Sequence, residues 1–169
     1  HERGMMIFRN RTDVAALITL AGLIVVIPMI VASDGRASTR QVMEERQVIR
    51  PETYPYFGLP YSPGILTGDT LYIAGHLGRD PVTTNLVSGG IEPETRQSLA
   101  NIREVLLTAG MDFENVVSVT AYIVDISEFA TFNEVYREYF PENPPARATV
   151  QVAALNVGAK VELQMIAVR

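Results

Sequence analysis

The longest apolar segment of the chain lies near its beginning, over residues 14–32. It holds nineteen residues without a charge, of which sixteen are apolar. Arg9 and Arg11 precede it, and a small polar run follows over residues 33–38. This order is typical of a secretory signal peptide. The length also suits an uncleaved membrane anchor, which needs roughly 17–25 residues, and a buried core helix is a third interpretation. The first two interpretations place the rest of the chain outside the cytoplasm.

A different pattern begins at about residue 51, where prolines and glycines make a loop-rich entry over residues 51–64. Residues 65–66 and 71–74 then predict two short strands joined by a turn at Gly68-Asp69. Residues 79–90 contain Pro81, Asn85, Gly89 and Gly90, which predict a loop.

Apolar residues at helical spacing predict two helices. The first is expected to begin near Pro93, which suits the first helical position, and to end at Gly110. Its apolar positions are Leu99, Ile102, Leu106 and Ala109. Ser127 is expected to cap the second helix. The apolar face of that helix consists of Phe129, Phe132, Val135, Tyr136 and Tyr139.

Three further strands complete the predicted domain, over residues 116–124, 148–154 and 161–168. The order β-β-α-β-α-β-β predicts one α+β domain over residues 51–169, preceded by a leader and linker over residues 1–50. Residues 33–50 are polar without a clear apolar period and are expected to be a linker or a short exposed helix. Two helices cover only one face of a sheet, so the other face is expected to need a partner.

Composition removes several classes of chemistry. The chain has no cysteine, which excludes disulfides, zinc ribbons, iron–sulfur clusters and thiol catalysis. It has two histidines and a single lysine, and no metal site is predicted. Its net charge is −5, divided as +2 over residues 1–50 and −7 over residues 51–169. Such a balance is unfavourable for a protein that binds nucleic acid.

Arg147 and Glu162 are the strongest candidates for chemistry. Side chains alternate between the faces of a strand, so a hairpin of the last two strands would allow both residues to share one face. The arginine could hold a carboxylate through two parallel hydrogen bonds. The glutamate could orient or deprotonate a water molecule. The alternative is an ordinary salt bridge on a solvated sheet face.

Three other polar residues have both a functional and a purely structural interpretation. Tyr61 is either a binding-site hydroxyl or an aromatic ring that packs on a proline loop. His76 is a catalyst or, more simply, a loop or interface residue. Asn133 on the second helix would by default face solvent. No glycine-rich phosphate loop is present, and Asp80, Asp112 and Asp125 lie far apart in the sequence.

Residues 59–169 resemble the RidA/YjgF family of enamine/imine deaminases. The motifs that carry the resemblance are Gly68-Asp69-Thr70-Leu71-Tyr72-Ile73-Ala74-Gly75, Gly89-Gly90-Ile91-Glu92, Thr95-Arg96-Gln97-Ser98-Leu99-Ala100-Asn101-Ile102, Phe129-Ala130-Thr131-Phe132-Asn133-Glu134-Val135-Tyr136, Pro144-Pro145-Ala146-Arg147-Ala148-Thr149-Val150 and Val161-Glu162-Leu163-Gln164-Met165-Ile166-Ala167-Val168.

The resemblance implies a chorismate-mutase-like α+β fold, with a mixed sheet and two helices on one face, assembled as a homotrimer with clefts between subunits. It implies hydrolysis of 2-imino and 2-enamino acids, such as 2-aminoacrylate, to 2-oxo acids and ammonia without a cofactor. By motif, Arg147 would bind the substrate carboxylate and Glu162 would orient the hydrolytic water. The pocket would be lined by Tyr61, Ala74, Gly75, Asn133 and Thr149, the last through its backbone amide.

Three positions depart from the family pattern. Ala74 stands where the archetype has serine, His76 replaces a common glutamine, and Gln164 replaces a common glutamate. These changes bear on the choice of substrate more than on the class of reaction. A non-catalytic trimer that binds a small carboxylate or a protein client is the alternative, and ribonuclease activity a further one. The leader implies a periplasmic or secreted domain, or one tethered to a membrane.

Overall fold

The computed structural model describes residues 18–20, 23–25, 45–52 and 60–169. The chain divides into two units, His1–Val42 and Met43–Arg169. In the first unit, β1 (Ile18–Leu20) and β2 (Leu23–Val25) pair in antiparallel fashion. The rest of the predicted signal peptide or anchor lies outside the described residues. Within the described ranges, no helix has the length and apolar character needed to cross a membrane.

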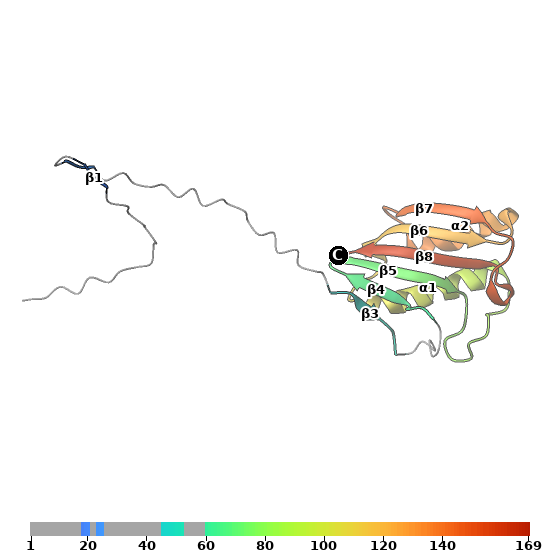
Figure 1. Ribbon diagram of the computed structural model, residues 1–169. Coiled ribbons are helices and arrows are strands. Elements are labelled where there is room, and N and C mark those ends of the chain that lie inside the picture. The colour runs from blue at the N-terminus through green and yellow to red at the C-terminus, as the bar shows by residue number, and fades with distance from the viewer. Residues whose placement is uncertain (1–17, 21–22, 26–44, 53–59) are drawn as a thin grey trace, which may run out of the picture. The chain divides into compact units, whose positions relative to one another are not determined.

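The second unit is built on a six-stranded sheet in the order β3-β4-β5-β8-β6-β7 (Figure 1). All neighbouring strands are antiparallel except β6 and β7, which are parallel, so the sheet is mixed. The strands are β3 (Gln47–Ile49), β4 (Gly64–Thr67), β5 (Thr70–Leu77), β6 (Val116–Ile123), β7 (Ala146–Gln151) and β8 (Val161–Val168).

Two helices, α1 (Ile91–Thr108) and α2 (Phe129–Tyr139), lie side by side on one face of this sheet (Figure 1). Alternate residues of the central strands point to the helices and are almost fully buried, among them Leu71, Ile73, Val119, Leu163 and Met165. The residues between them point to the other face, which no described helix covers. The predicted α+β domain with helices on one face is therefore confirmed.

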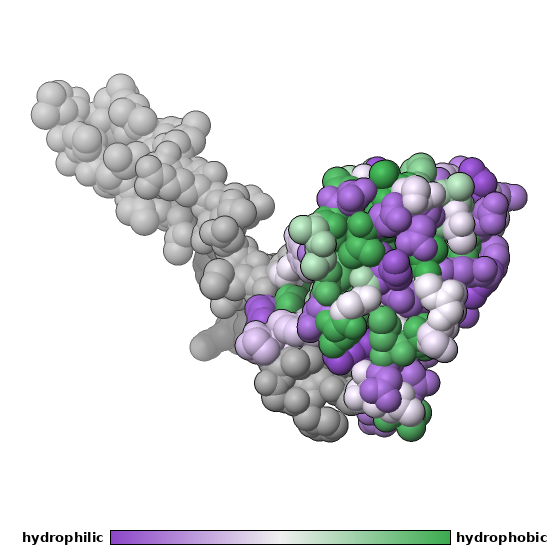
Figure 2. Space-filling model, turned by 90° about the vertical axis from the view of Figure 1, so that its right-hand side faces the viewer, coloured by the Kyte–Doolittle hydropathy of each residue, from purple (hydrophilic) through white to green (hydrophobic). Residues whose placement is uncertain are grey.

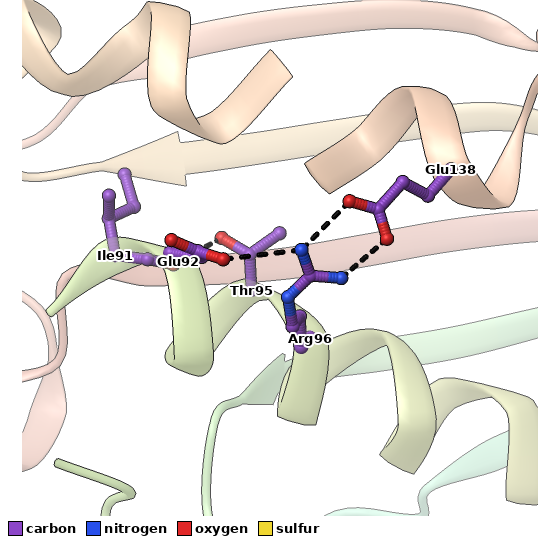
Figure 3. A network of polar contacts seen from close by, with 5 residues as sticks. All are labelled: Ile91, Glu92, Thr95, Arg96 and Glu138. Carbon is purple, nitrogen blue, oxygen red and sulfur yellow. Dashed lines mark hydrogen bonds and ion pairs between the residues drawn. The ribbon is translucent and has the colours of Figure 1, made fainter. Parts of the chain in front are cut away.

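The two helices are joined at their surface by Arg96. Its guanidinium makes two hydrogen bonds to the Glu138 carboxylate on α2, at 2.5 and 2.8 Å, and a third to Glu92 one turn earlier on α1 (Figure 3). Thr95 beside it donates to the Ile91 carbonyl inside the first turn. Both partners of the Arg96–Glu138 pair are well exposed, so the pair orients the helices more than it stabilises the domain.

The prediction of a linker over residues 33–50 is wrong at its end. Gln47–Ile49 forms β3, which pairs with β4 through Ile49 opposite Gly64. Only Ile49 of this short edge strand is buried, and three residues are too few to show an alternating pattern.

The starts of both helices also differ from the prediction. Helix α1 begins at Ile91, two residues before Pro93, because proline is tolerated anywhere in a first turn whose N–H groups lack helical partners. Ser127 does not cap α2. It lies in a short 3₁₀ helix, Ile126–Glu128, and donates its hydroxyl and backbone N–H to the carboxylate of Asp125, which caps this 3₁₀ helix.

Candidate functional site

The predicted hairpin between the strands of Arg147 and Glu162 is wrong. Strand β6 lies between β7 and β8, so Arg147 pairs with Val119 while Glu162 pairs with Tyr122. The chain returns from α2 to an outer strand that runs parallel to β6, and a parallel pair needs such a crossover connection. Alternation along each strand was read correctly, but it carries no information on which strands are neighbours.

The two residues also lie on opposite faces of the sheet. Arg147 is in register with the buried Val119, so its side chain lies on the helix face, where it contacts α2. Glu162 lies on the uncovered face together with Tyr122 and Gln164. A single copy of the chain therefore does not bring the Arg147 guanidinium to the Glu162 carboxylate.

The Glu162 side chain lines a cavity of about 330 Å³ at the place where β5 ends and β8 begins. This volume is large enough for a small metabolite. We call it the Glu162 cavity, and it also contains three of the predicted site residues, Tyr61, Ala74 and Gly75. Hydrophobic and hydrophilic residues are intermixed over this end of the domain (Figure 2). The complete lining is Tyr61, Ala74, Gly75, Leu77, Arg79, Asp80, Pro81, Thr84, Asn156 and Glu162.

A β-bulge in β5 shapes the wall of this cavity. Ile73 pairs with Met165 and His76 with Leu163, so Ala74 and Gly75 together face the single residue Gln164. At Gly75 the backbone passes so close to Glu162 that a Cβ atom would overlap Oε1 of the carboxylate. Glycine at this position therefore leaves the space that the carboxylate occupies.

The Glu162 carboxylate is half-buried and has no hydrogen-bond or ion-pair partner among the described residues. Burial raises its pKa above the ordinary value of a glutamate, because the charged form loses water contacts. Burial also raises the pKa of Tyr61, an effect that the Arg79 guanidinium opposes and the Glu162 carboxylate adds to. A carboxylate with a raised pKa is a better proton acceptor near neutral pH, as a general base requires.

The remaining predicted site residues form a second set on β7 and α2, which we call the Arg147 group: Arg147, Asn133 and Thr149. Arg147 Nη2 donates to Asn133 Oδ1 at 2.6 Å. Its guanidinium also lies 4.3 Å from the ring centre of Tyr136, a cation–π contact. Asn133 thus holds the arginine and does not simply face solvent. The Thr149 hydroxyl is buried and has no hydrogen-bond partner in the described part of the chain.

His76 is neither a loop nor an interface residue. It lies within β5 on the helix face and is 2 % exposed. Burial lowers its pKa to about 4, although a hydrogen bond to the Pro63 carbonyl partly offsets this effect. The imidazole is therefore neutral at physiological pH, and its place is in the core.

Arg79 is a cavity residue that no sequence motif indicated. It follows the end of β5 and lines the Glu162 cavity from the loop that the sequence predicted. Its carbonyl accepts a hydrogen bond from Asn101 of α1, which fixes the backbone at this point. The available signal was a lone arginine between a strand end and the Asp80-Pro81 turn. Among the described residues, no cluster of three or more His, Asp or Glu side chains could hold a metal ion.

Comparisons with known proteins cover the same part of the chain. Residues 53–169 match the family described as Endoribonuclease L-PSP. A Bos taurus protein named 2-iminobutanoate/2-iminopropanoate deaminase is 47% identical over 124 residues, which are 73% of this chain and 90% of that protein. A crystal structure of a Thermotoga maritima protein named as an endoribonuclease has a TM-score of 0.71 at 33% identity, and the match covers 74% and 98% of the two chains. Escherichia coli TdcF with bound serine has a TM-score of 0.69 at 31% identity, with 73% and 98% covered.

Proposed function

The chain belongs to the Endoribonuclease L-PSP family, which is the RidA/YjgF family that its motifs indicated, and we infer that it is a 2-imino acid deaminase. The resemblance drawn from the motifs is thereby confirmed. The enzyme hydrolyses the C=N bond of 2-imino acids, formed by tautomerisation of 2-enamino acids such as 2-aminoacrylate. The products are a 2-oxo acid and ammonia.

The observation that carries the mechanism is the Glu162 carboxylate in its cavity. It is half-buried, without a described partner, and its pKa is raised by burial. Such a carboxylate can accept a proton from a water molecule that attacks C2 of the imine. It can then return that proton to the nitrogen, which gives a carbinolamine. It next takes the hydroxyl proton of the carbinolamine and passes it to the nitrogen, so that the C=O bond forms as the C–N bond breaks and ammonia leaves. The attacking water supplies the oxygen of the 2-oxo acid, so all atoms are accounted for.

In this proposal Arg147 binds the substrate carboxylate, because its guanidinium can form two parallel hydrogen bonds to that group. Asn133 and the Tyr136 ring hold it in place. Because Arg147 and Glu162 of one copy lie on opposite faces of the sheet, a working site needs Arg147 from a neighbouring copy. The backbone amide of Thr149 follows in the same strand and would serve the same carboxylate.

A homotrimer would provide this arrangement and is the assembly we propose. Its support is the uncovered face of the sheet, which carries large apolar side chains in water. Tyr72 is 50% exposed and Val150 43% exposed on that face. Packing of copies on this face would bury such side chains. Since Arg147 lies on the edge strand β7, we propose that its guanidinium reaches the Glu162 cavity of the next copy past this edge.

The cavity also supports roles for the other predicted residues. Tyr61 offers a hydroxyl, and the bulge at Gly75 exposes backbone groups that a sheet ladder would otherwise occupy. Ala74 presents only a methyl group, so the cavity lacks the hydroxyl that a serine would place there. We propose that this difference alters which imines are accepted, while the hydrolytic step stays with Glu162.

The leader supports the proposal that this domain works outside the cytoplasm, either released after cleavage or tethered by residues 14–32. The support is the apolar run of nineteen residues behind Arg9 and Arg11. Intact-mass measurement of the protein from membrane and soluble fractions of the producing cells distinguishes the two forms. A full-length protein found only in the cytosolic fraction would overturn the proposal.

The test of the activity compares four proteins in one assay. An amino-acid oxidase generates 2-imino acids in place, and their removal is followed with the wild type, Arg147→Ala, Glu162→Gln and the control Arg137→Ala. Arg137 is an exposed residue of α2 outside both sets of site residues. The wild type and the control are expected to accelerate removal, and the other two variants to lose about 10²–10⁴-fold of that rate.

Equal rates for all four proteins, or no acceleration by the wild type, would contradict the activity. Tight binding of a 2-oxo acid without turnover would then favour the non-catalytic binding protein. Cleavage of RNA by clean preparations, unaffected by Arg147→Ala, would favour a nuclease. The charge of −7 over residues 51–169 works against that outcome, because phosphate contacts dominate nucleic-acid affinity.

A further inference from the structure

The Glu162 cavity contains a positive charge that the proposed reaction does not use. Arg79 lines the cavity together with Glu162 and Tyr61. Its charge reaches the tyrosine hydroxyl, where it opposes the rise in the pKa of Tyr61. The Arg79 backbone is held in place by two hydrogen bonds. Its N–H donates to the Leu77 carbonyl at 2.8 Å, and its carbonyl accepts from the Asn101 side chain at 2.9 Å.

This guanidinium is not neutralised by the described residues. Its Nε is buried and has no hydrogen-bond partner among them, and no ion pair of Arg79 occurs there. Asp80 also lines the cavity but forms no ion pair with Arg79 in the described part of the chain, and its Oδ1 accepts from the N–H groups of Val82 and Thr83 and from the Thr83 hydroxyl. A partly buried guanidinium without a direct ion-pair partner favours binding of an anion that can supply those hydrogen bonds.

The anion that Arg79 would bind differs from the one assigned to Arg147. Arg147 serves the carboxylate at C1 of every 2-imino acid and reaches the cavity from a neighbouring copy. Arg79 belongs to the same copy as Glu162, and its backbone follows the strand end that lies opposite Glu162. A substrate held by both guanidinium groups therefore carries an acidic group at each end, with the imine carbon between them beside Glu162.

We propose that Arg79 binds a second carboxylate of the substrate, so that this enzyme prefers 2-imino dicarboxylic acids to 2-imino acids with short apolar side chains. The proposal rests on the proposed deaminase function and names the substrate class of that same site. The guanidinium would meet the distal carboxylate with two charge-assisted hydrogen bonds. Ala74 fits this assignment, since its small side chain leaves room for a longer substrate.

The test measures a specificity ratio. An amino-acid oxidase produces the imine of aspartate or glutamate in one set of assays and the imine of alanine in the other. The ratio of kcat/KM for the dicarboxylic over the monocarboxylic imine is determined for the wild type, Arg79→Met, Arg79→Lys and the control Arg137→Met. The wild-type ratio is expected to exceed one, and Arg79→Met to lower it about tenfold or more.

The two further variants separate charge from geometry. Arg79→Lys keeps the charge but not the planar pair of donors, so its ratio is expected to lie between the other two. Arg137→Met, which removes an exposed arginine from α2, is expected to keep the wild-type ratio. An equal fall in both kcat/KM values for Arg79→Met, or a wild-type ratio below one, would overturn the proposal.

A second measurement does not depend on turnover. Calorimetric titration with oxaloacetate or 2-oxoglutarate is compared with pyruvate, for the wild type and Arg79→Met. The dicarboxylic product is expected to bind more tightly to the wild type, and this difference is expected to shrink about tenfold in the variant. If no imine is hydrolysed but the binding difference exists, the deaminase function fails and the Arg79 subsite stands. If imines are hydrolysed without any such difference, the subsite fails alone.

Discussion

The two sets of site residues lie on opposite faces of one sheet and are built in opposite ways. Arg147 lies on the helix face, held by Asn133 Oδ1 at 2.6 Å and by the Tyr136 ring. Glu162 lies on the uncovered face in a cavity, with no described partner and a pKa raised by burial. The arginine is thus positioned before any ligand arrives, whereas the carboxylate is left reactive. This difference suits a fixed binding group and a group that accepts and returns a proton.

The strongest test of this comparison asks whether the two faces belong to one site. Glu162→Gln and Arg147→Ala are co-expressed with different tags, and mixed assemblies are purified. If a site takes Arg147 from one copy and Glu162 from the next, each purified mixed trimer has one intact site, so mixing restores about a third of the sites. Each variant alone is expected to be nearly inactive. Mixed assemblies that remain as inactive as the parents would show that the two residues do not share a site between copies.

A second prediction concerns a substitution that affects the uncovered face alone. In Gly75→Ala the new Cβ overlaps Oε1 of Glu162, and the flexible carboxylate must move while the strand stays. We expect kcat to fall about 10²-fold or more, with an unchanged circular-dichroism spectrum.

The control for this variant is the double substitution Gly75→Ala with Glu162→Gln. Because both changes act on the same carboxylate, the double variant is expected to be hardly slower than Glu162→Gln alone. Fully multiplicative losses would contradict the assignment and would place the effect of Gly75 elsewhere.

A third prediction concerns the helix face and is smaller. Burial lowers the pKa of His76 from 6.5 to about 4, so the folded state binds this proton less readily than the unfolded state. The contribution of neutral His76 to the free energy of unfolding is therefore complete above about pH 6.5. As the pH falls from there towards 4, the free energy of unfolding decreases by about 3 kcal/mol.

His76→Gln removes the titrating group and is the matched control, because an amide can still donate to the Pro63 carbonyl. Urea unfolding of both proteins at pH 7 and pH 4.5 gives the difference in stability loss, in which the carboxylates common to both cancel. We expect the glutamine variant to lose less stability on acidification. An identical loss in both proteins would show that His76 is not the source.

Much of the fold could be predicted from sequence because its elements are long and strongly patterned. The apolar spacing from Leu99 to Leu106 predicted α1, and the alternation over residues 161–168 matches β8. Strand β3 could not be found, since Ile49 is its single buried residue. Apart from β4 and β5, which the predicted turn at Gly68-Asp69 joins, the neighbours of the strands could not be found, because alternation within a strand says nothing about what lies beside it.

The candidate site was likewise predictable only in part. Glu162, Gly75 and Tyr61 were chosen from motifs and do lie around one cavity. The pairing of Arg147 with Glu162 failed within one chain because it depended on strand order. Arg79 was missed because a single arginine in a loop has no periodicity, and only the folded chain brings it to Glu162.

The bulge at Ala74 and Gly75 has a consequence for chain length. The sheet does not need both residues: if one were deleted, Gln164 would face the other, while His76 would still pair with Leu163 and Leu77 with Glu162. Every core position on either side would keep its face. A shortened chain could thus preserve the architecture and lose the space beside the carboxylate. The space beside the carboxylate thus depends on one residue of length in β5 that the rest of the sheet does not require.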